Sequence, residues 1–407
     1  MTYDAADGYV LLFGGCACPQ NGAVAGVQSD TWKFANSTWS RVAVNASPPA
    51  RSMAGLAYDA SDGYVVLFGG QGSSGTFNDT WEYTNGGWSL LTPLLAPPWT
   101  PGAEMTYDGA DNYVVLLSGS FPPSTWTFHA GAWTNLTARG DRSPDGPAAN
   151  PIVYDSTDGY VLLFGTAHAL PSSPPSLEAA TWRFLGGNWS NVTGASGTTP
   201  PARDAASVAD FPPGGFVLLF GGSEAFGGVS APRNDTWAYS SGNWTLLATA
   251  FGPGPRSDMT GTFTPNGSLD VFYGGWYGAI PPSPSACQTP GACADTWTWT
   301  GGGVSTPLIQ SFSAVPRVVD LGASTQLLAR VLGGSAPFSY HYTGLPNGCT
   351  STNVSPLNCT PSALGVSSVM IQVTDVRGHS ATARTTVDVV TGLTVTGFAS
   401  SPDSASA

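Results

Sequence analysis

One cassette recurs six times along this chain of 407 residues. Each copy holds an apolar run such as YVLLFGG, a variable stretch and a Thr-Trp pair, and all but the last add a second tryptophan seven residues after the first. The Thr-Trp pairs are Thr31-Trp32, Thr80-Trp81, Thr125-Trp126, Thr181-Trp182, Thr236-Trp237 and Thr296-Trp297. The second tryptophans are Trp39, Trp88, Trp133, Trp189 and Trp244, with Val304 at this place in the last copy. Successive pairs lie 45 to 60 residues apart, the length of one four-stranded propeller blade. The repetition predicts an all-β propeller with six visible blades, or seven in the parent protein if one copy is missing.

The composition fits short strands joined by tight turns. Hydrophobic residues make up 42% of the chain, which is enough for real cores, while only 10% of residues are charged. The chain has 52 glycines and 34 prolines, which suit turns and are unfavourable inside long helices. We therefore expect little helix.

The charge balance argues against two classes of partner. Thirteen basic residues stand against twenty-six acidic ones, and Lys33 is the only lysine. Such a chain has no basic surface for a phosphate backbone or for anionic lipid, so nucleic acid is not an expected partner. No run of 18 apolar residues could span a bilayer, and no charged and apolar leader opens the sequence. Because Met1 already lies inside a repeat, we expect the chain to be cut from a longer one whose leader and anchor are absent here.

Cysteines and glycosylation sequons favour an exported, cell-surface protein. Cys287 with Cys293, and Cys349 with Cys359, have spacings that would close small loops in an oxidising compartment, whereas the state of Cys16 and Cys18 is left open. Eleven Asn-X-Ser/Thr sequons accompany them, at Asn36, Asn45, Asn78, Asn135, Asn188, Asn191, Asn234, Asn243, Asn266, Asn353 and Asn358. Some of these follow from the repeat itself, since Asn78 and Asn234 merely precede a recurrent Asp-Thr-Trp.

The second copy shows the expected strand order. Residues 51–58 are mostly small and predict an inner strand near the axis, and residues 64–68 form an apolar run typical of a strand buried on both faces. Trp81 and Tyr83 are two apart and so share one face of the third strand, which we expect to meet the next blade. A Gly-Gly turn then predicts the hairpin into a fourth strand at Trp88.

These units resemble kelch repeats, the blades of kelch propellers and of the galactose oxidase central domain. The resemblance covers residues 1–305 and rests on Tyr-Asp before a hairpin, an apolar strand that ends in Gly-Gly, and Asp-Thr-Trp with a spaced tryptophan. It implies the propeller fold and says little of function, because such propellers serve as binding platforms, linkers and occasionally enzymes. The copies are degraded at Ser118-Gly119 and Gly165-Thr166, which replace two Gly-Gly pairs.

The composition changes near Leu308, where tryptophan disappears and Thr, Val and Ser alternate. We expect a β-sandwich over residues 306–391. Short stretches, among them Gly344 to Cys349 and Leu357 to Thr360, resemble the Ig-like, PKD-type modules of microbial, especially archaeal, surface proteins. Residues 392–407 are expected to be a linker or the start of a further module that is cut short.

No catalytic constellation emerges from the sequence. The resemblance to galactose oxidase would imply copper held by two tyrosines and two histidines, but His129, His168, His341 and His379 are scattered over turns, loops and the predicted sandwich. No G-x-S-x-G elbow is present for a serine hydrolase. We therefore expect no enzymatic activity, no cofactor and no metal site.

Paired acids recur between the first and second strands of four copies. Turn capping, with a glycine supplying positive φ, is the preferred interpretation, and calcium binding is the alternative. The pairs are Asp4/Asp7, Asp59/Asp62, Asp108/Asp111 and Asp155/Asp158.

Candidate binding residues lie on the face that carries the long variable loops. Trp99 and Trp276 stand outside the repeat register, and with Tyr277 they could stack on a sugar or anchor a protein, or else fill gaps between loops. By resemblance to kelch adaptors that bind acidic peptides, Arg51, Arg203 and Arg256 would face the axial channel with Glu104 nearby. The alternative for the arginines is a structural pairing with Asp204 or Asp258.

Together these observations predict an extracellular recognition or adhesion scaffold that binds a protein or glycan through its loop face without catalysis. The alternative is a substrate-targeting fragment of a secreted carbohydrate-active enzyme. The oligomeric state is left open.

Overall fold

The structure is a computed structural model that describes most of residues 1–391. The segments outside the description are 17–25, 99–102, 119–122, 138–143, 145–150, 169–175, 195–198, 225–231, 248–252, 266–268, 278–290, 300–306, 333, 335–336 and 392–407. The predicted further module at 392–407 therefore lies outside the described residues.

The chain divides into two compact units, Met1–Gly303 and Val304–Ala407. Strands dominate both units, and helix in the described part is limited to short 3₁₀ turns such as η2 (Pro212–Gly214). No helix among the described residues has the length and apolar character of a membrane span. The predicted all-β class is confirmed.

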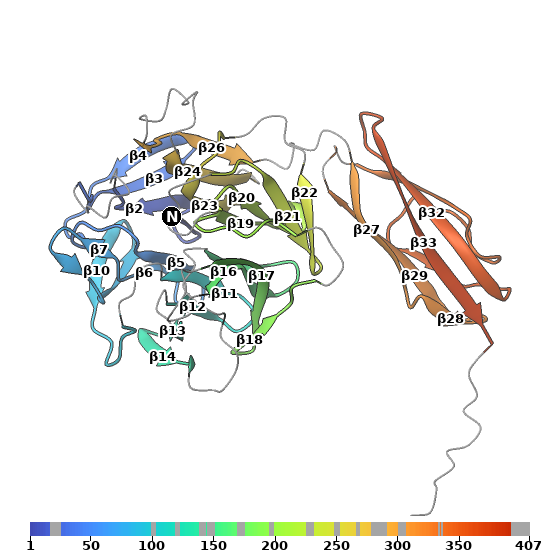
Figure 1. Cartoon of the computed structure of the whole chain (residues 1–407), viewed down its shortest axis with the longest axis horizontal. Coiled ribbons are helices and arrows are strands. Elements are labelled where there is room, and N and C mark those ends of the chain that lie inside the picture. Colours follow the sequence, from blue (N-terminus) through green and yellow to red (C-terminus); the bar gives the residue numbers. More distant parts are fainter. Residues whose placement is uncertain are drawn as a thin grey trace, which may run out of the picture. The chain divides into compact units, whose positions relative to one another are not determined.

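The first unit contains six antiparallel sheets, called blades one to six here, which lie around a common centre (Figure 1). Blade one consists of β1 (Thr2–Asp4), β2 (Tyr9–Phe13), β3 (Thr31–Ala35) and β4 (Thr38–Val42). Blade two consists of β5 (Gly55–Asp59), β6 (Tyr64–Phe68), β9 (Thr80–Thr84) and β10 (Gly87–Leu91), with the small hairpin β7 (Gln71–Gly72) and β8 (Gly75–Thr76). Blade three consists of β11 (Glu104–Asp108), β12 (Tyr113–Leu117), β13 (Thr125–His129) and β14 (Ala132–Asn135).

The remaining three blades follow the same order. Blade four consists of β15 (Ile152–Asp155), β16 (Tyr160–His168), β17 (Ser176–Leu185) and β18 (Asn188–Asn191). Blade five consists of β19 (Ser207–Phe211), β20 (Phe216–Phe220), β21 (Thr236–Ser240) and β22 (Asn243–Leu247). In blade six, β23 (Ser257–Thr264) pairs with β24 (Leu269–Tyr277), and β24 pairs with both β25 (Gly291–Ala292) and β26 (Thr296–Trp299).

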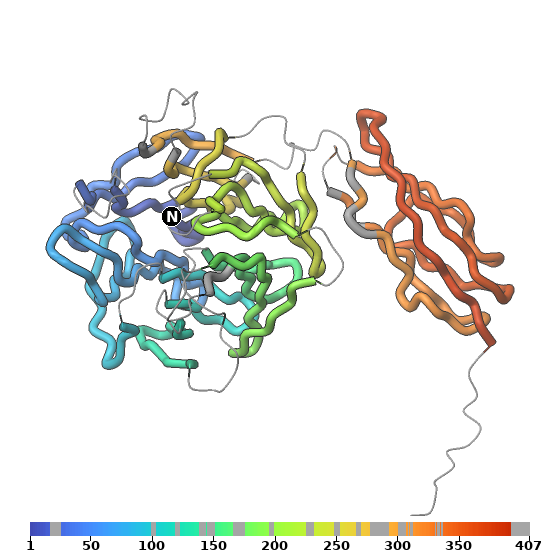
Figure 2. The backbone as a smooth tube through the Cα atoms, in the orientation of Figure 1, coloured from blue at the N-terminus to red at the C-terminus, as the bar shows by residue number. Residues whose placement is uncertain are grey.

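The six blades close into a ring. Each inner strand packs against the inner strands of both neighbours, in the order β1, β5, β11, β15, β19 and β23, and β23 packs against β1 again. The tube in Figure 2 shows the chain passing once around this centre. The ring of this chain thus holds six blades, the number that the repeats show, and a seventh blade in a parent protein stays a prediction.

A hydrogen bond between neighbouring blades explains the recurrent Thr-Trp spacing. The second tryptophan of a blade donates its Nε1–H to the threonine hydroxyl of the preceding blade's Thr-Trp pair. The five bonds are Trp88 to Thr31 (3.0 Å), Trp133 to Thr80 (2.9 Å), Trp189 to Thr125 (2.9 Å), Trp244 to Thr181 (2.9 Å) and Trp39 to Thr296 (2.8 Å). The last of them joins blade one to blade six, and the Trp39 ring also lies 5.3 Å from that of Tyr273. The cassette is therefore the unit that joins one blade to the next.

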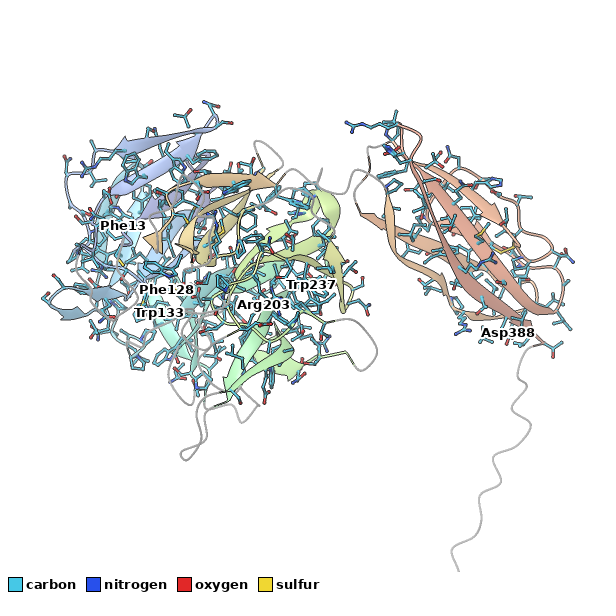
Figure 3. The ribbon with its side chains drawn as sticks, turned by 45° about the horizontal axis from the view of Figure 1, so that its top comes forward. Phe13, Phe128, Trp133, Arg203, Trp237 and Asp388 are labelled. Carbon is cyan, nitrogen blue, oxygen red and sulfur yellow. A yellow bond between two sulfur atoms is a disulfide. The ribbon has the colours of Figure 1, made fainter. Side chains whose placement is uncertain are left out.

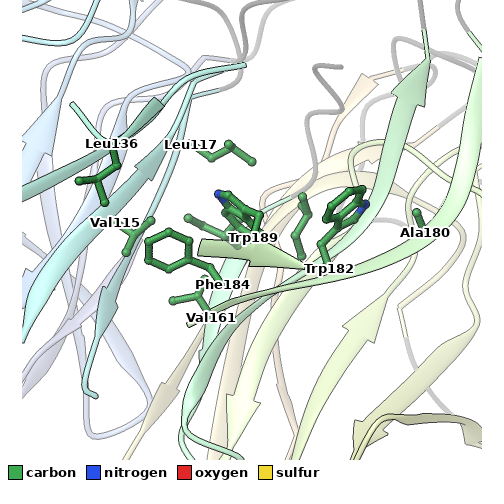
Figure 4. Packing of buried hydrophobic residues seen from close by; sticks show 10 residues of the cluster. Val115, Leu117, Leu136, Val161, Ala180, Trp182, Phe184 and Trp189 are labelled. Carbon is green, nitrogen blue, oxygen red and sulfur yellow. The ribbon is translucent and has the colours of Figure 1, made fainter. Parts of the chain in front are cut away.

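Apolar side chains fill the spaces between blades. One cluster joins Val115, Leu117 and Leu136 of blade three to Trp182 and Phe184 of blade four (Figure 4). The third-strand aromatic face consequently meets the preceding blade, and the prediction that it meets the next blade is wrong. The direction follows from the ring's curvature, which the alternation of side chains along one strand does not specify.

The predicted inner strand of blade two begins later than residue 51. Met53 adopts a φ of 57°, a left-handed conformation that interrupts a strand, so that β5 starts only at Gly55. Ala205 and Asp258 have the same conformation at the corresponding places of blades five and six. The segment from Arg51 to Ala54 is therefore bent and precedes the strand. Its side chains do not alternate between two faces as they would in an extended strand.

The second unit is a β-sandwich. One sheet contains β27 (Leu308–Val315), β29 (Thr325–Leu332) and β31 (Leu357–Cys359), and the other contains β28 (Val318–Asp320), β30 (Ser339–Thr343), β32 (Gly365–Thr374) and β33 (Ser380–Val390). Leu327 and Leu357 of the first sheet pack against Ile371 and Val387 of the second. The predicted disulfide between Cys349 and Cys359 is present.

Candidate functional site

The three arginines proposed for ligand binding are internal to their blades. Arg51, Arg203 and Arg256 are 0% exposed. Arg203 donates through Nη1 and Nη2 to the carboxylate of Asp235 at 2.7 and 2.8 Å, and through Nη1 to the carbonyl of Gly221 at 2.8 Å. Figure 3 shows Arg203 and Trp237 in this part of the ring. A guanidinium so enclosed cannot contact an axial ligand, so the structure favours the structural alternative.

The carboxylates that hold these arginines belong to the cassette. Arg51 pairs with Asp79 and Arg256 with Asp295, so each partner directly precedes a Thr-Trp pair. The pairings with Asp204 and Asp258 stay predictions. Burial alone would raise the pKa of Asp79, but hydrogen bonds from Arg51 and Trp81 hold that pKa below its ordinary value. Arginine, carboxylate and indole thus form one structural node in each of these blades.

Two carboxyl groups lie on inner strands at opposite sides of the ring. Glu104 is the first residue of β11 in blade three, and Asp258 lies at the start of β23 in blade six. Because these inner strands are three places apart in a ring of six, they lie on opposite sides of the axis. Each carboxyl group nevertheless contributes to the electrostatic environment at this end of the axis, where Asp258 raises the pKa of Glu104.

Both groups titrate closer to neutrality than ordinary acids. Burial raises the pKa of Glu104 to about 7, with the amino group of Met1 opposing the rise and Asp258 adding to it. Asp258 has solvent-exposed surface, yet desolvation by the surrounding protein raises its pKa to about 6, while a 2.8 Å hydrogen bond from the Ser257 hydroxyl opposes this and Asp204 adds to it. Near pH 7 this pair can therefore both donate and accept hydrogen bonds.

Apolar groups accompany these acids where the inner strands begin. Met53 is 61% exposed and occupies the place in blade two that Asp258 occupies in blade six. Trp276, half-buried on β24, pairs with Ser257, the residue before Asp258. We call Met53, Glu104, Asp258 and Trp276 the axial rim. The side chain of Tyr277 and the whole of Trp99 lie outside the described residues.

Sequence reasoning missed two members of this rim. The sequence pattern places Met53 in the inner strand and gives Asp258 only as a possible partner for an arginine. One sequence feature could have identified them: Met53 and Asp258 each lie two residues after a repeated arginine, Arg51 and Arg256. Both residues have a positive φ, and one sequence does not reveal that conformation.

The paired acids of the turns follow the structural interpretation. Oδ1 of Asp59 accepts hydrogen bonds from the backbone amides of Ser61 and Asp62 at 3.0 and 3.3 Å, and Gly63 has a φ of 76°. Oδ2 of Asp62 accepts a bond from the amide of Ala130 in the next blade at 2.8 Å. These carboxylates cap turns and connect blades.

Histidines and other metal-binding side chains do not gather in the described part of the chain. His129 is exposed and 3.3 Å from the Ser61 hydroxyl, and His379 lies 3.2 Å from Asp375 in the second unit. His341 is exposed on β30, and the side chain of His168 lies outside the described residues. No cluster of three or more metal-binding side chains occurs among the residues that the structure describes.

The other cysteines are oxidised where they are described. Cys16 and Cys293 are each disulfide-bonded, with partners outside the described residues. The predicted bridge from Cys287 to Cys293 therefore stays a prediction.

Comparison with known proteins gives a similarity of fold. No protein-family model matches the chain, and no curated protein matches it. Among solved structures 132 chains match. One of them is the structure of YjhT, with a TM-score of 0.46 and 14% identity, covering 66% of this chain and 87% of that chain.

One expectation from the sequence is corrected here, namely that the chain lacks enzymatic activity. That prediction rested only on failing to find a familiar catalytic constellation, and it is withdrawn. The match assigns neither a reaction nor a catalytic residue to this chain.

Proposed function

We propose that this chain is an extracellular carbohydrate-binding propeller whose axial rim holds a neutral sugar. The observation that carries the proposal is the pair of carboxyl groups, Glu104 and Asp258, on opposite sides of the axis beside Trp276. A ligand placed on the axis would meet both carboxyl groups at once.

The chemistry of the rim suits a polyhydroxylated ligand. Carboxyl groups that titrate near neutrality accept hydrogen bonds from sugar hydroxyls and, when protonated, also donate them. The indole of Trp276 and the thioether of Met53 supply apolar surface for the C–H face of a sugar ring. Strong polar groups beside an apolar surface are the usual composition of a small-molecule site.

An anionic ligand fits this rim poorly. Arg51, Arg203 and Arg256 have no exposed surface with which to pair it. The whole chain carries a formal net charge of −13, which repels anions at long range. A basic peptide is the competing ligand class, and the experiment below separates it from sugar.

The surface of the chain supports export and N-glycosylation. All ten sequon asparagines in the described part of the chain are exposed; only Asn266 lies outside it. The disulfide between Cys349 and Cys359 fits an oxidising compartment. We extend the proposal to a kelch type for the blades and to an Ig-like or PKD-like type for the sandwich, supported by the cassette's hydrogen bonds and by the two packed sheets.

A glycan array followed by calorimetry tests the proposal. We expect micromolar binding of at least one neutral glycan, reduced tenfold or more in Glu104→Gln, Asp258→Asn or Trp276→Ala, since each removes one contact group. The matched control is Glu82→Gln, on the third strand of blade two and away from the rim, which should bind like wild type.

The same samples decide between the alternatives. Binding of basic peptides in place of glycans, with loss in Glu104→Gln, would replace the sugar by a cationic ligand. Binding that survives all three rim variants would refute the site. The bound glycan is also checked for chemical change, because catalysis at the rim would be an activity beyond the binding proposed here.

A further inference from the structure

One carboxyl group is buried in the apolar contact between blades five and six. Asp270 is the second residue of β24 and is 0% exposed. Neither of its carboxyl oxygens has a hydrogen-bond partner. A buried polar group without a partner is costly, and an ionised one costs more.

The repeat shows that this position is normally apolar. The second residue of each second strand is paired in register with the inner strand, and in the five other blades that residue is a valine exposed by at most 1%. These valines are Val10, Val65, Val114, Val161 and Val217. The same register pairs Asp270 with Phe263. Asp270 thus takes the place of a core valine.

A second substitution accompanies it in blade five. In blades one to four the last residue of the inner strand is an aspartate, such as Asp59, whose carboxylate caps the following turn. Blade five has Phe211 at this place, and its ring lies 6.0 Å from that of Phe263 in blade six. Asp270 is therefore paired with a phenylalanine that contacts a second aromatic ring across the blades.

One further polar atom lies beside it. Trp299 on β26 is the direct neighbour of Asp270 in the sheet, and its buried Nε1 also lacks a hydrogen-bond partner. Of the strands packed on Asp270, which are β19, β23 and β26, β19 carries the charged group that acts on it electrostatically, Asp210, whose Oδ2 accepts a hydrogen bond from the amide of Ser156 in blade four. No described cation offsets a negative charge on Asp270.

We propose that Asp270 is a proton-dependent switch in the ring: when protonated it completes the contact between blades five and six, and when ionised it opens that contact. The indole of Trp299 and the carboxyl of Asp210 are the polar groups within its surroundings. The switch belongs to blade six, whose strand β24 also carries Trp276.

Titration supports the direction of this switch. Burial raises the pKa of Asp270 to about 9, and the nearby Asp210 adds to the rise. Burial also raises the pKa of Asp210 to about 7. In the unfolded chain an aspartate titrates near about 3.9. Between these two pKa values the folded form binds one more proton than the unfolded form. Each rise of one pH unit therefore lowers the folding equilibrium constant by up to tenfold.

Thermal unfolding from pH 5 to pH 9 tests the proposal with two variants. Asp270→Val restores the valine of the other blades, and Asp270→Asn keeps the shape without the titrating proton. We expect the wild type to lose melting temperature as pH rises, and both variants to lose less, with Asp270→Val the more stable at pH 8. Glu178→Gln, an exposed acid on β17, is the control that should follow the wild type.

Two results would overturn the switch. One is a wild-type pH profile parallel to that of Asp270→Asn, and the other is an Asp270→Val protein less stable than wild type at pH 8. Hydrogen exchange locates the effect, because the protection factors of β24 amides should fall between pH 6 and pH 9 in wild type and hold in Asp270→Asn. Unchanged protection in wild type would also refute it. None of these measurements depends on finding the ligand of the axial rim.

Discussion

Replacing Thr181 by valine tests whether the cassette stabilises the ring through its hydrogen bond between blades. Thr181 is 1% exposed and accepts a bond from Nε1 of Trp244 at 2.9 Å. Valine keeps the volume and removes the acceptor, so the indole N–H stays buried without a partner. Such a group costs about 1 to 3 kcal/mol.

The expected shift in melting temperature follows from the size of the unit. An unfolding entropy of about 2.1 cal/mol/K per residue, applied to the unit Met1–Gly303, amounts to roughly 600 cal/mol/K. A loss of about 2 kcal/mol then lowers the melting temperature by about 3 °C.

Tryptophan fluorescence is the assay of choice. All 14 tryptophans precede residue 300, so their signal reports the first unit and is silent on the sandwich. Thr134→Val is the matched control, because Thr134 lies exposed on β14 and should tolerate the change within about 0.5 kcal/mol.

A double-mutant cycle assigns the effect to the bond itself. Trp244→Phe removes the donor and much of the packing, so Thr181→Val should cost far less in that background than in wild type. A Thr181→Val protein that melts with the wild type, or an equal cost in both backgrounds, would refute the role given to this bond.

Three further substitutions probe the ring. Thr296→Val removes the acceptor of Trp39 and should cost about 1 to 3 kcal/mol by denaturant unfolding, whereas no cost would mean that blades one and six do not close the ring in solution. Ala180→Ser offers an acceptor to the buried and unpartnered Nε1 of Trp182, as Ser124 does for Trp126, and should raise stability by about 1 kcal/mol; a lower melting temperature would count against it. Arg203→Lys cannot reproduce the bidentate pair and the two carbonyl bonds of the guanidinium, so we expect a loss of about 3 kcal/mol, and a wild-type urea midpoint would contradict the node.

Features that depend on neighbouring residues were predictable from the sequence. The apolar run at 64–68 became β6, and the turn beginning at Asp59 was capped by the aspartate as predicted. Alternation, turn residues and apolar runs act over a few residues, so each copy of the repeat carries this information in itself. The disulfide from Cys349 to Cys359 belongs to the same group, because a short loop brings its ends together.

The candidate site was only partly predictable. Glu104 and Trp276 were identified, yet the three arginines proposed with them proved to be internal, because their aspartate partners lie 28 to 39 residues away in the chain. Asp258 and Asp270 were missed as functional groups. Residues of other blades surround these side chains, and the local sequence pattern does not predict which residues those are.

The amino-acid sequence by itself determined the blade, its strand order, its turns and its all-β class, since each arises from short-range preferences repeated along the chain. Only the tertiary structure decided that six blades close the ring, that Glu104 and Asp258 share its axis, and that Asp270 lies in an apolar contact. Closure, axial geometry and burial depend on how successive sheets curve and pack, and that is a property of the whole ring.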